Sequence, residues 1–137
     1  MSEQQRRFRL LIDREGEADL FRVKEEDPWA HAQIYVLLQE YESGTFPPEE
    51  LIDEYFESSE IENVVPFWHL QNEKLNVYRL KLVKVNAWRV LTAGDHISRE
   101  VAVLAIMHRD QNYQADAKLV ERIRNSYENF GFKRLGQ

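Results

Sequence analysis

The 137-residue sequence contains no cysteine, which excludes disulfide bonds and metal sites built on thiolates. Because no disulfide has to form, a cytosolic location is the default expectation. The four histidines are scattered, with no two at the i, i+3 or i+4 spacing of a helical metal site, and no HExxH motif is present. We therefore expect no metal ion.

Long apolar runs and glycines are also scarce. No apolar run approaches the roughly 18 residues of a membrane-spanning helix, so we expect no contact with a membrane. The first apolar run, Leu10 to Ile12, is shorter than the core of a secretory signal, which has about 7–15 residues. The sequence has 5 glycines and contains no phosphate-binding loop, nucleophile elbow or dinucleotide fingerprint. We therefore expect no cofactor.

The remaining composition is typical of a globular protein, with 43% hydrophobic and 12% aromatic residues. We expect a single domain over residues 1–137 with a substantial core. The net charge of −6 is unevenly distributed, since residues 1–62 hold 17 Asp/Glu and 6 Lys/Arg, whereas residues 63–137 hold 7 and 12. Either the second half forms an anion-binding face on an otherwise acidic chain, or folding mixes the two halves.

Three apolar runs between residues 76 and 113 predict β-strands. Residues 77–85 alternate apolar with basic side chains, as in a strand with one face on a core. Residues 87–93 form the second run, and residues 100–107 are almost continuously apolar, as in a strand covered on both faces. The short gaps favour antiparallel neighbours, because a parallel pair needs a crossover of a dozen or more residues. These runs therefore predict a three-stranded meander.

The segments before this meander are less clearly patterned. Residues 7–13 predict a first strand. From Glu17 the chain either returns as the second strand of a hairpin or begins a helix, and so short a stretch does not decide between them. Residues 60–74 have no clean period and predict a connector that is in part a strand or a packed loop.

Three helices are predicted from their end signals. Residues 28–44 begin after a capping aspartate with proline at the first helical position, and they end at a glycine. Residues 47–59 begin at paired prolines followed by acidic residues, which complement the helix dipole. These two helices predict a helical hairpin. Residues 116–131 carry apolar side chains at helical spacing and also end at a glycine.

The predicted fold class is therefore α+β. A mostly antiparallel sheet, made of the N-terminal strand and the C-terminal three-stranded meander, would pack with the helical hairpin and the C-terminal helix.

Short motifs in the predicted sheet resemble the bacterial RelE/ParE-like toxins of type II toxin–antitoxin systems. The residues that carry the resemblance are Tyr78 to Lys81, Trp88 to Leu91, Val103 to Arg109, and Tyr113. The specific matches lie within residues 76–113. The resemblance implies a small α+β fold and a cognate antitoxin as partner. It also implies cleavage of messenger RNA, usually on the ribosome, by attack of a 2′-hydroxyl on the adjacent phosphate. Nothing in the sequence specifies an oligomeric state.

The resemblance also implies a role for individual residues. Arg79 and Lys81 would bind RNA, and Arg89 and Arg109 would hold the scissile phosphate. Fixed guanidinium groups stabilise the negative charge that develops on phosphoryl oxygens.

Proton transfer would fall to His108 or Tyr113. Histidine titrates near neutrality, which suits an acid or base. Tyrosine, with a pKa near about 10, suits the task only if cations lower that pKa, and otherwise it can stack on a base.

Each of these residues also has a plainer interpretation. Arg89 could be an outward strand residue paired with a carboxylate. His108 and Arg109 could form a salt-bridged end of the strand, and the ring of Tyr113 could pack on a helix.

The sequence pI of about 5.3 weakens long-range attraction to RNA. The alternative function is a non-catalytic protein-binding member of the same fold, an adaptor or gyrase inhibitor, that binds through its sheet or acidic helices. The acidic residues from Glu49 to Glu57 predict a solvated helix face.

Overall fold

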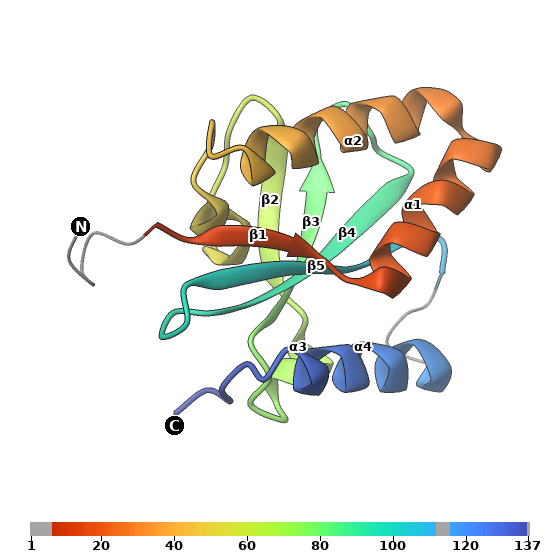
Figure 1. Ribbon diagram of the computed structural model, residues 1–137. Coiled ribbons are helices and arrows are strands. Elements are labelled where there is room, and N and C mark those ends of the chain that lie inside the picture. Colours follow the sequence, from red (N-terminus) through yellow and green to blue (C-terminus); the bar gives the residue numbers. More distant parts are fainter. Residues whose placement is uncertain (1–6, 112–115, 137) are drawn as a thin grey trace.

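The computed structural model describes residues 7–111 and 116–136. Over these residues the chain forms a five-stranded sheet with helices on both faces (Figure 1). The elements in chain order are β1 (Arg9–Ile12), α1 (Arg14–Glu26), α2 (Pro28–Glu42), the 3₁₀ helix η2 (Pro48–Ile52), β2 (Ile61–Pro66), α3 (Trp68–Gln71), β3 (Val77–Leu82), β4 (Trp88–Asp95), β5 (Glu100–His108) and α4 (Ala117–Asn129).

The sheet is mixed, with strand order β1-β5-β4-β3-β2. Strands β2 to β5 run antiparallel in sequence order, as their short connections favour. Strand β1 instead pairs with β5 in parallel, from Arg9 opposite Glu100 to Ile12 opposite Val103. The prediction of an α+β fold is confirmed, whereas the prediction of a mostly antiparallel sheet is wrong. The reason is that β1 lies beside the last strand, β5, and runs in the same direction, whereas the chain that leaves β1 through α1 and α2 re-enters the sheet at its opposite edge, as β2.

Strand β2 comes from the connector whose pattern left strand and packed loop open. It adds a fourth strand to the predicted meander, paired to β3 through a register that shifts between Ile61 and Asn63. This bulge explains why apolar and polar residues do not alternate regularly along β2, because an extra residue moves the following side chains to the other face of the sheet.

The structure contains a helical hairpin, but it consists of α1 and α2 and not of the helices predicted over residues 28–44 and 47–59. Asp13 caps α1 by accepting a hydrogen bond from the backbone N–H of Glu15 at 3.2 Å, so a helix follows β1 rather than a hairpin strand. Asp27 caps α2 in the same way, as predicted, by accepting from the N–H of Ala30 at 3.1 Å.

The helix predicted over residues 47–59 is wrong. Only η2 forms there, and Leu51 and Ile52 are buried against the sheet. The carbonyl of Leu51 accepts a hydrogen bond from the hydroxyl of Thr92 in β4 at 2.6 Å. The apolar residues of this segment therefore dock on the sheet without building a regular helix.

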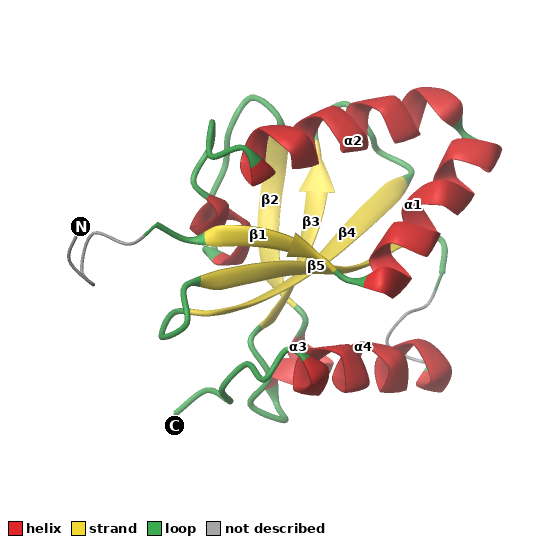
Figure 2. Cartoon of the chain, viewed as in Figure 1, coloured by secondary structure: helices red, strands yellow, loops and turns green. Residues whose placement is uncertain are grey.

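Two apolar clusters cover the two faces of the sheet, and helices lie over both of these faces (Figure 2). One cluster joins the sheet to α1, α2 and η2 and contains Ile34 and Leu51. The other joins it to α3 and α4 and contains Leu70 and Ile123. Residues 101–107 of β5 are buried throughout, as predicted for a strand covered on both faces.

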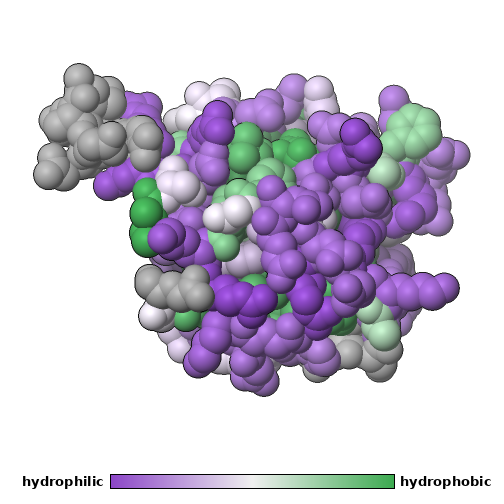
Figure 3. Space-filling model, turned by 60° about the horizontal axis from the view of Figure 1, so that its bottom comes forward, coloured by the Kyte–Doolittle hydropathy of each residue, from purple (hydrophilic) through white to green (hydrophobic). Residues whose placement is uncertain are grey.

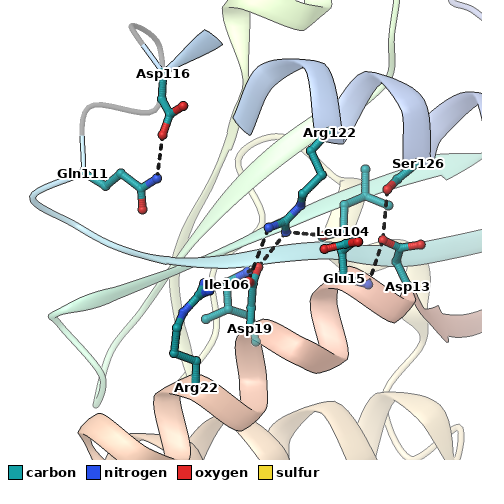
Figure 4. Close-up of polar contacts among 10 residues, drawn as sticks. All are labelled: Asp13, Glu15, Asp19, Arg22, Leu104, Ile106, Gln111, Asp116, Arg122 and Ser126. Atoms are coloured by element: carbon teal, nitrogen blue, oxygen red, sulfur yellow. Dashed lines mark hydrogen bonds and ion pairs between the residues drawn. The ribbon is translucent and has the colours of Figure 1, made fainter. Parts of the chain in front are cut away.

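Helix α1 also closes the edge of β5 beyond the end of β1 (Figure 4). The carboxylate of Asp19 accepts a hydrogen bond from the backbone N–H of Ile106 at 2.9 Å and lies 2.6 Å from Nη2 of Arg122 in α4. That same nitrogen donates to the carbonyl of Leu104 at 3.1 Å. A Cβ added at Gly16 would lie 2.8 Å from the carbonyl oxygen of Val103, so α1 can approach β5 this closely only with glycine there.

Candidate functional site

Three of the predicted site cations lie on the same side of the sheet. Lys81 of β3 is directly opposite Arg89 of β4, and directly opposed residues share a face. Arg79 precedes Lys81 by two residues and therefore shares that face as well. Leu80, between them, belongs to the cluster beneath α1 and α2, so the three cations project from the side that carries α3 and α4.

Arg109 continues the same row of charges. Its backbone N–H donates to the carbonyl of Ala87 at 2.8 Å, which extends the pairing of β4 and β5 by one residue. Met107 is opposite Arg89, so alternation places Arg109 on the side of Arg89 as well. We call the surface formed by Arg79, Lys81, Arg89 and Arg109 the basic face.

The cations of the basic face are held by neighbouring groups. The ammonium of Lys81 lies 2.8 Å from a carboxylate oxygen of Glu62, in the adjacent strand β2. Nη1 of Arg89 donates to the carbonyls of Asn86 at 2.8 Å and Trp88 at 3.2 Å. Arg109 is 3.9 Å from a carboxylate oxygen of Asp110. The contacts of Arg89 with carbonyls orient its side chain, whereas an anion that binds Lys81 or Arg109 has to compete with the carboxylates of Glu62 and Asp110.

His108 lies on the opposite side of the sheet. It is paired with Trp88, and the two rings meet edge to face with centroids 5.2 Å apart. The indole N–H of Trp88 donates to Asp27, between α1 and α2, at 3.3 Å. The structure therefore does not bring His108 to the basic face. Tyr113, the other candidate for proton transfer, lies outside the described residues.

A depression of about 470 Å³ runs along the edge strand β2, beside the basic face. Two aromatic rings in it are exposed, Tyr55 at 83% and Trp68 at 56%. Carboxylates of Glu54, Glu57 and Glu62 line it as well. We call this depression the β2 groove.

The β2 groove and the basic face meet at Asn63. This residue lines the groove and is directly opposite Lys81 in the ladder of β2 and β3. Its side-chain oxygen is buried and has no hydrogen-bond partner among the described residues. The hydroxyl of Tyr55 is hydrogen-bonded to Glu54, and this bond raises the pKa of the tyrosine.

Little in the sequence indicates the groove. Glu54 and Glu57 are predicted to lie on a solvated helix face, but they line a hollow after η2. Trp68 lies in the connector for which the sequence leaves strand and packed loop open. A tryptophan in a polar connector is the one signal in the sequence, because an exposed indole is unusual unless it contacts something.

The side of the molecule that carries α4 is largely hydrophilic, and its apolar side chains gather in small separate areas (Figure 3). Among the described residues, no group of three or more His, Asp or Glu side chains could hold a metal ion. Within residues 7–111 and 116–136, no helix combines the length and the apolarity that crossing a membrane requires.

Comparisons with protein-family models, curated proteins and solved structures found no match to this chain.

Proposed function

We propose that the protein is a RelE/ParE-like toxin that cleaves messenger RNA on the ribosome, with the basic face as its RNA-binding surface. The observation that carries the proposal is the cross-strand pair of Lys81 and Arg89, with Arg79 and Arg109 on the same side of the sheet. Four cations on one surface suit a phosphodiester backbone, because binding to RNA depends chiefly on neutralising its phosphates.

The chemistry required is attack of a ribose 2′-hydroxyl on the adjacent phosphate, which forms a 2′,3′-cyclic phosphate and breaks the bond to the 5′-oxygen of the next nucleotide. The 2′-hydroxyl loses a proton and the leaving 5′-oxygen takes one up. Negative charge then develops on the non-bridging oxygens, and guanidinium groups stabilise it through paired hydrogen bonds. Arg89 and Arg109 lie on neighbouring strands and are suited to clamp that phosphate from two sides. Arg79 and Lys81, on β3, would contact the backbone on one side of it.

Proton transfer needs a base close to these cations. Glu62 is the residue that the geometry favours, because its carboxylate lies 2.8 Å from Lys81 and its side chain is 49% exposed. A carboxylate in that position can take the 2′-hydroxyl proton while the ammonium stabilises the phosphate. His108 could act only across the sheet, so we assign it no direct part. Tyr113 stays a prediction as proton donor.

The test is induced expression together with incubation of the purified protein with messenger RNA and ribosomes. The wild type should arrest growth and cut the message, whereas Arg89→Ala and Arg109→Ala should each reduce cleavage at least about tenfold, as loss of a transition-state contact does. Arg9→Ala is the matched control, since this arginine lies in β1, is 70% exposed and is paired with Glu100. Absence of both growth arrest and cleavage by the wild type would end the nuclease proposal.

A second candidate function is binding of a protein without catalysis. It is favoured by the outer surface of α2, where Trp29 is 57% exposed and Val36 52% exposed. These residues are seven apart, so they lie on one side of the helix. Exposed aromatic and aliphatic side chains of this kind mark protein contacts more often than RNA contacts. Capture of a stable protein partner, lost in Trp29→Ala and accompanied by intact RNA, would favour this function.

A further inference from the structure

The two exposed rings of the β2 groove come from separate segments. Tyr55 follows η2, and Trp68 begins α3 on the far side of β2. Both rings line the same hollow, although neither is needed to fill the two apolar clusters. Exposing an indole and a phenol in one hollow costs hydrophobic free energy, and a ligand that covers them recovers it.

The charged side chains that line this groove are all carboxylates. They belong to Glu54, Glu57 and Glu62, and that of Glu62 lies 2.8 Å from the ammonium of Lys81. No lysine or arginine is among the described residues that line the groove. The lining therefore favours a ligand that brings donors and positive charge, and it disfavours phosphate, which the carboxylates would repel.

We propose that the β2 groove binds an arginine-containing, basic peptide segment of a partner protein. A guanidinium group suits both parts of the lining, because it stacks on aromatic faces and forms paired hydrogen bonds with carboxylates. In the docked peptide, one arginine stacks on Trp68 and donates to Glu57. The groove adjoins the basic face, because Glu62 lines the groove and is paired with Lys81, but the peptide proposal does not rest on the nuclease proposal.

The peptide is held by side chains and not by extending the sheet. Strand β2 is an edge strand, but the carbonyl of Val64 already accepts a hydrogen bond from the N–H of Tyr55 at 3.4 Å. Pro66 has no N–H to offer an added strand.

The experiment measures fluorescence anisotropy of a capped, fluorescein-labelled peptide of alternating arginine and glycine. A matched peptide carries citrulline, which keeps the shape of arginine and removes its charge. The wild-type protein should bind the arginine peptide and not the citrulline peptide. Trp68→Ala and Glu57→Gln should each weaken binding about tenfold.

Trp29→Ala is the control, because this tryptophan on α2 is equally exposed, at 57%, and lies outside the groove. Arg89→Ala should also leave peptide binding unchanged, which separates this site from the basic face. Circular dichroism of each variant checks folding, and Tyr55→Ala, at an 83% exposed position, replaces Trp68→Ala if that variant does not fold.

Three results would overturn the proposal. The first is equal affinity of the wild type for the arginine and citrulline peptides. The second is binding of the arginine peptide by Trp68→Ala and Glu57→Gln with the affinity of the wild type. The third is competition by a short oligoribonucleotide in a manner that requires Trp68, because the groove would then hold a nucleobase and not a peptide.

Discussion

The carboxylate of Asp19 lies 2.6 Å from Nη2 of Arg122, and this pair completes the edge of β5 where β1 has ended. Asp19 comes from α1 and Arg122 from α4, so the contact joins the helices of the two layers around the sheet. The backbone N–H of Ile106 and the carbonyl of Leu104 are satisfied by these two side chains in place of a neighbouring strand. The pair therefore has the hydrogen-bonding role that a further strand would have.

Removing the carboxylate should be strongly destabilising. Asp19 is 2% exposed, and Asp19→Ala would leave the N–H of Ile106 and the guanidinium of Arg122 without their acceptor. Loss of one partner of a buried pair costs about 3–5 kcal/mol, so the free energy of unfolding in urea should fall by about that amount. The control is Arg22→Ala, since this arginine also contacts Asp19 but is 59% exposed, and its loss should cost about 1 kcal/mol or less. Equal effects of the two substitutions would contradict this account of the edge.

Gly16→Ala should destabilise the protein although alanine is the better helix former. Propensity alone favours alanine over glycine by about 1 kcal/mol in a helix interior. At this position the added Cβ would lie 2.8 Å from the backbone carbonyl of Val103, which a shift of α1 must relieve at a cost of about 1–3 kcal/mol. Thermal unfolding followed by circular dichroism gives the sign of the change. Glu17→Ala, at the next and exposed position of α1, should be close to neutral.

The pair of Glu73 and Arg124 should make stability depend on acidic pH. Two hydrogen bonds of 2.8 Å join them, and the bond from Arg124 is the main cause that lowers the pKa of Glu73 below its ordinary value of 4.5. Because the folded-state pKa is the lower one, the contribution is fully present above pH 4.5 and is lost as the pH falls through the folded-state value.

Glu73→Gln should therefore reduce the free energy of unfolding by about 1 kcal/mol at neutral pH. The difference in this free energy between the wild type and the variant should shrink as the pH is lowered. Urea titrations of both proteins between neutral and acidic pH measure this difference. Glu25→Gln, on the exposed surface of α1, should show no such trend. A difference that is constant with pH would mean that the substitution acts through something other than the ion pair.

Salt dependence should identify the cations that meet RNA. If Arg89 neutralises one phosphate, Arg89→Ala should lower the slope of log K against log salt concentration by about 0.7 for single-stranded RNA. The measurement is fluorescence anisotropy of a labelled oligoribonucleotide at several salt concentrations. Arg9→Ala should leave the slope unchanged, because Arg9 lies in β1, on the far edge of the sheet. An unchanged slope for Arg89→Ala would remove Arg89 from the binding surface.

The sequence predicted those elements whose signals are local. Strands β3 to β5 follow from apolar runs with short gaps, and α2 follows from a capping aspartate and a proline at its start. The parallel partner of β1 is not predictable in this way, because β1 pairs with the last strand of the sheet and no local signal connects two segments so far apart in the chain. The sequence likewise predicts a longer helix where only η2 forms. Its apolar residues recur at a spacing that resembles one face of a helix, but they are apolar because they pack against the sheet.

The position of His108 was not predictable for a different reason. Residues 101–107 are apolar on both faces, so they show no alternation from which the side of the following residue could be counted. The pairing of β4 with β5 also shifts register between Leu91 and Thr92. Beyond this shift, counting alternate residues along the strand assigns side chains to the wrong face of the sheet. By contrast, Arg79 and Lys81 lie in a strand that alternates cleanly, and their shared face was predictable from spacing alone.

The parallel pairing of β1 with β5 has a consequence for biosynthesis. Among the five strands of this sheet, β1 leaves the ribosome exit tunnel first and pairs with β5, which leaves last, since Arg9 is opposite Glu100. A nascent chain released before β5 is complete would leave β1 unpaired and the edge of β4 uncovered, and open edges of this kind promote aggregation. Translation that stops before β5 should therefore yield insoluble fragments, which ties folding of the sheet to the synthesis of β5.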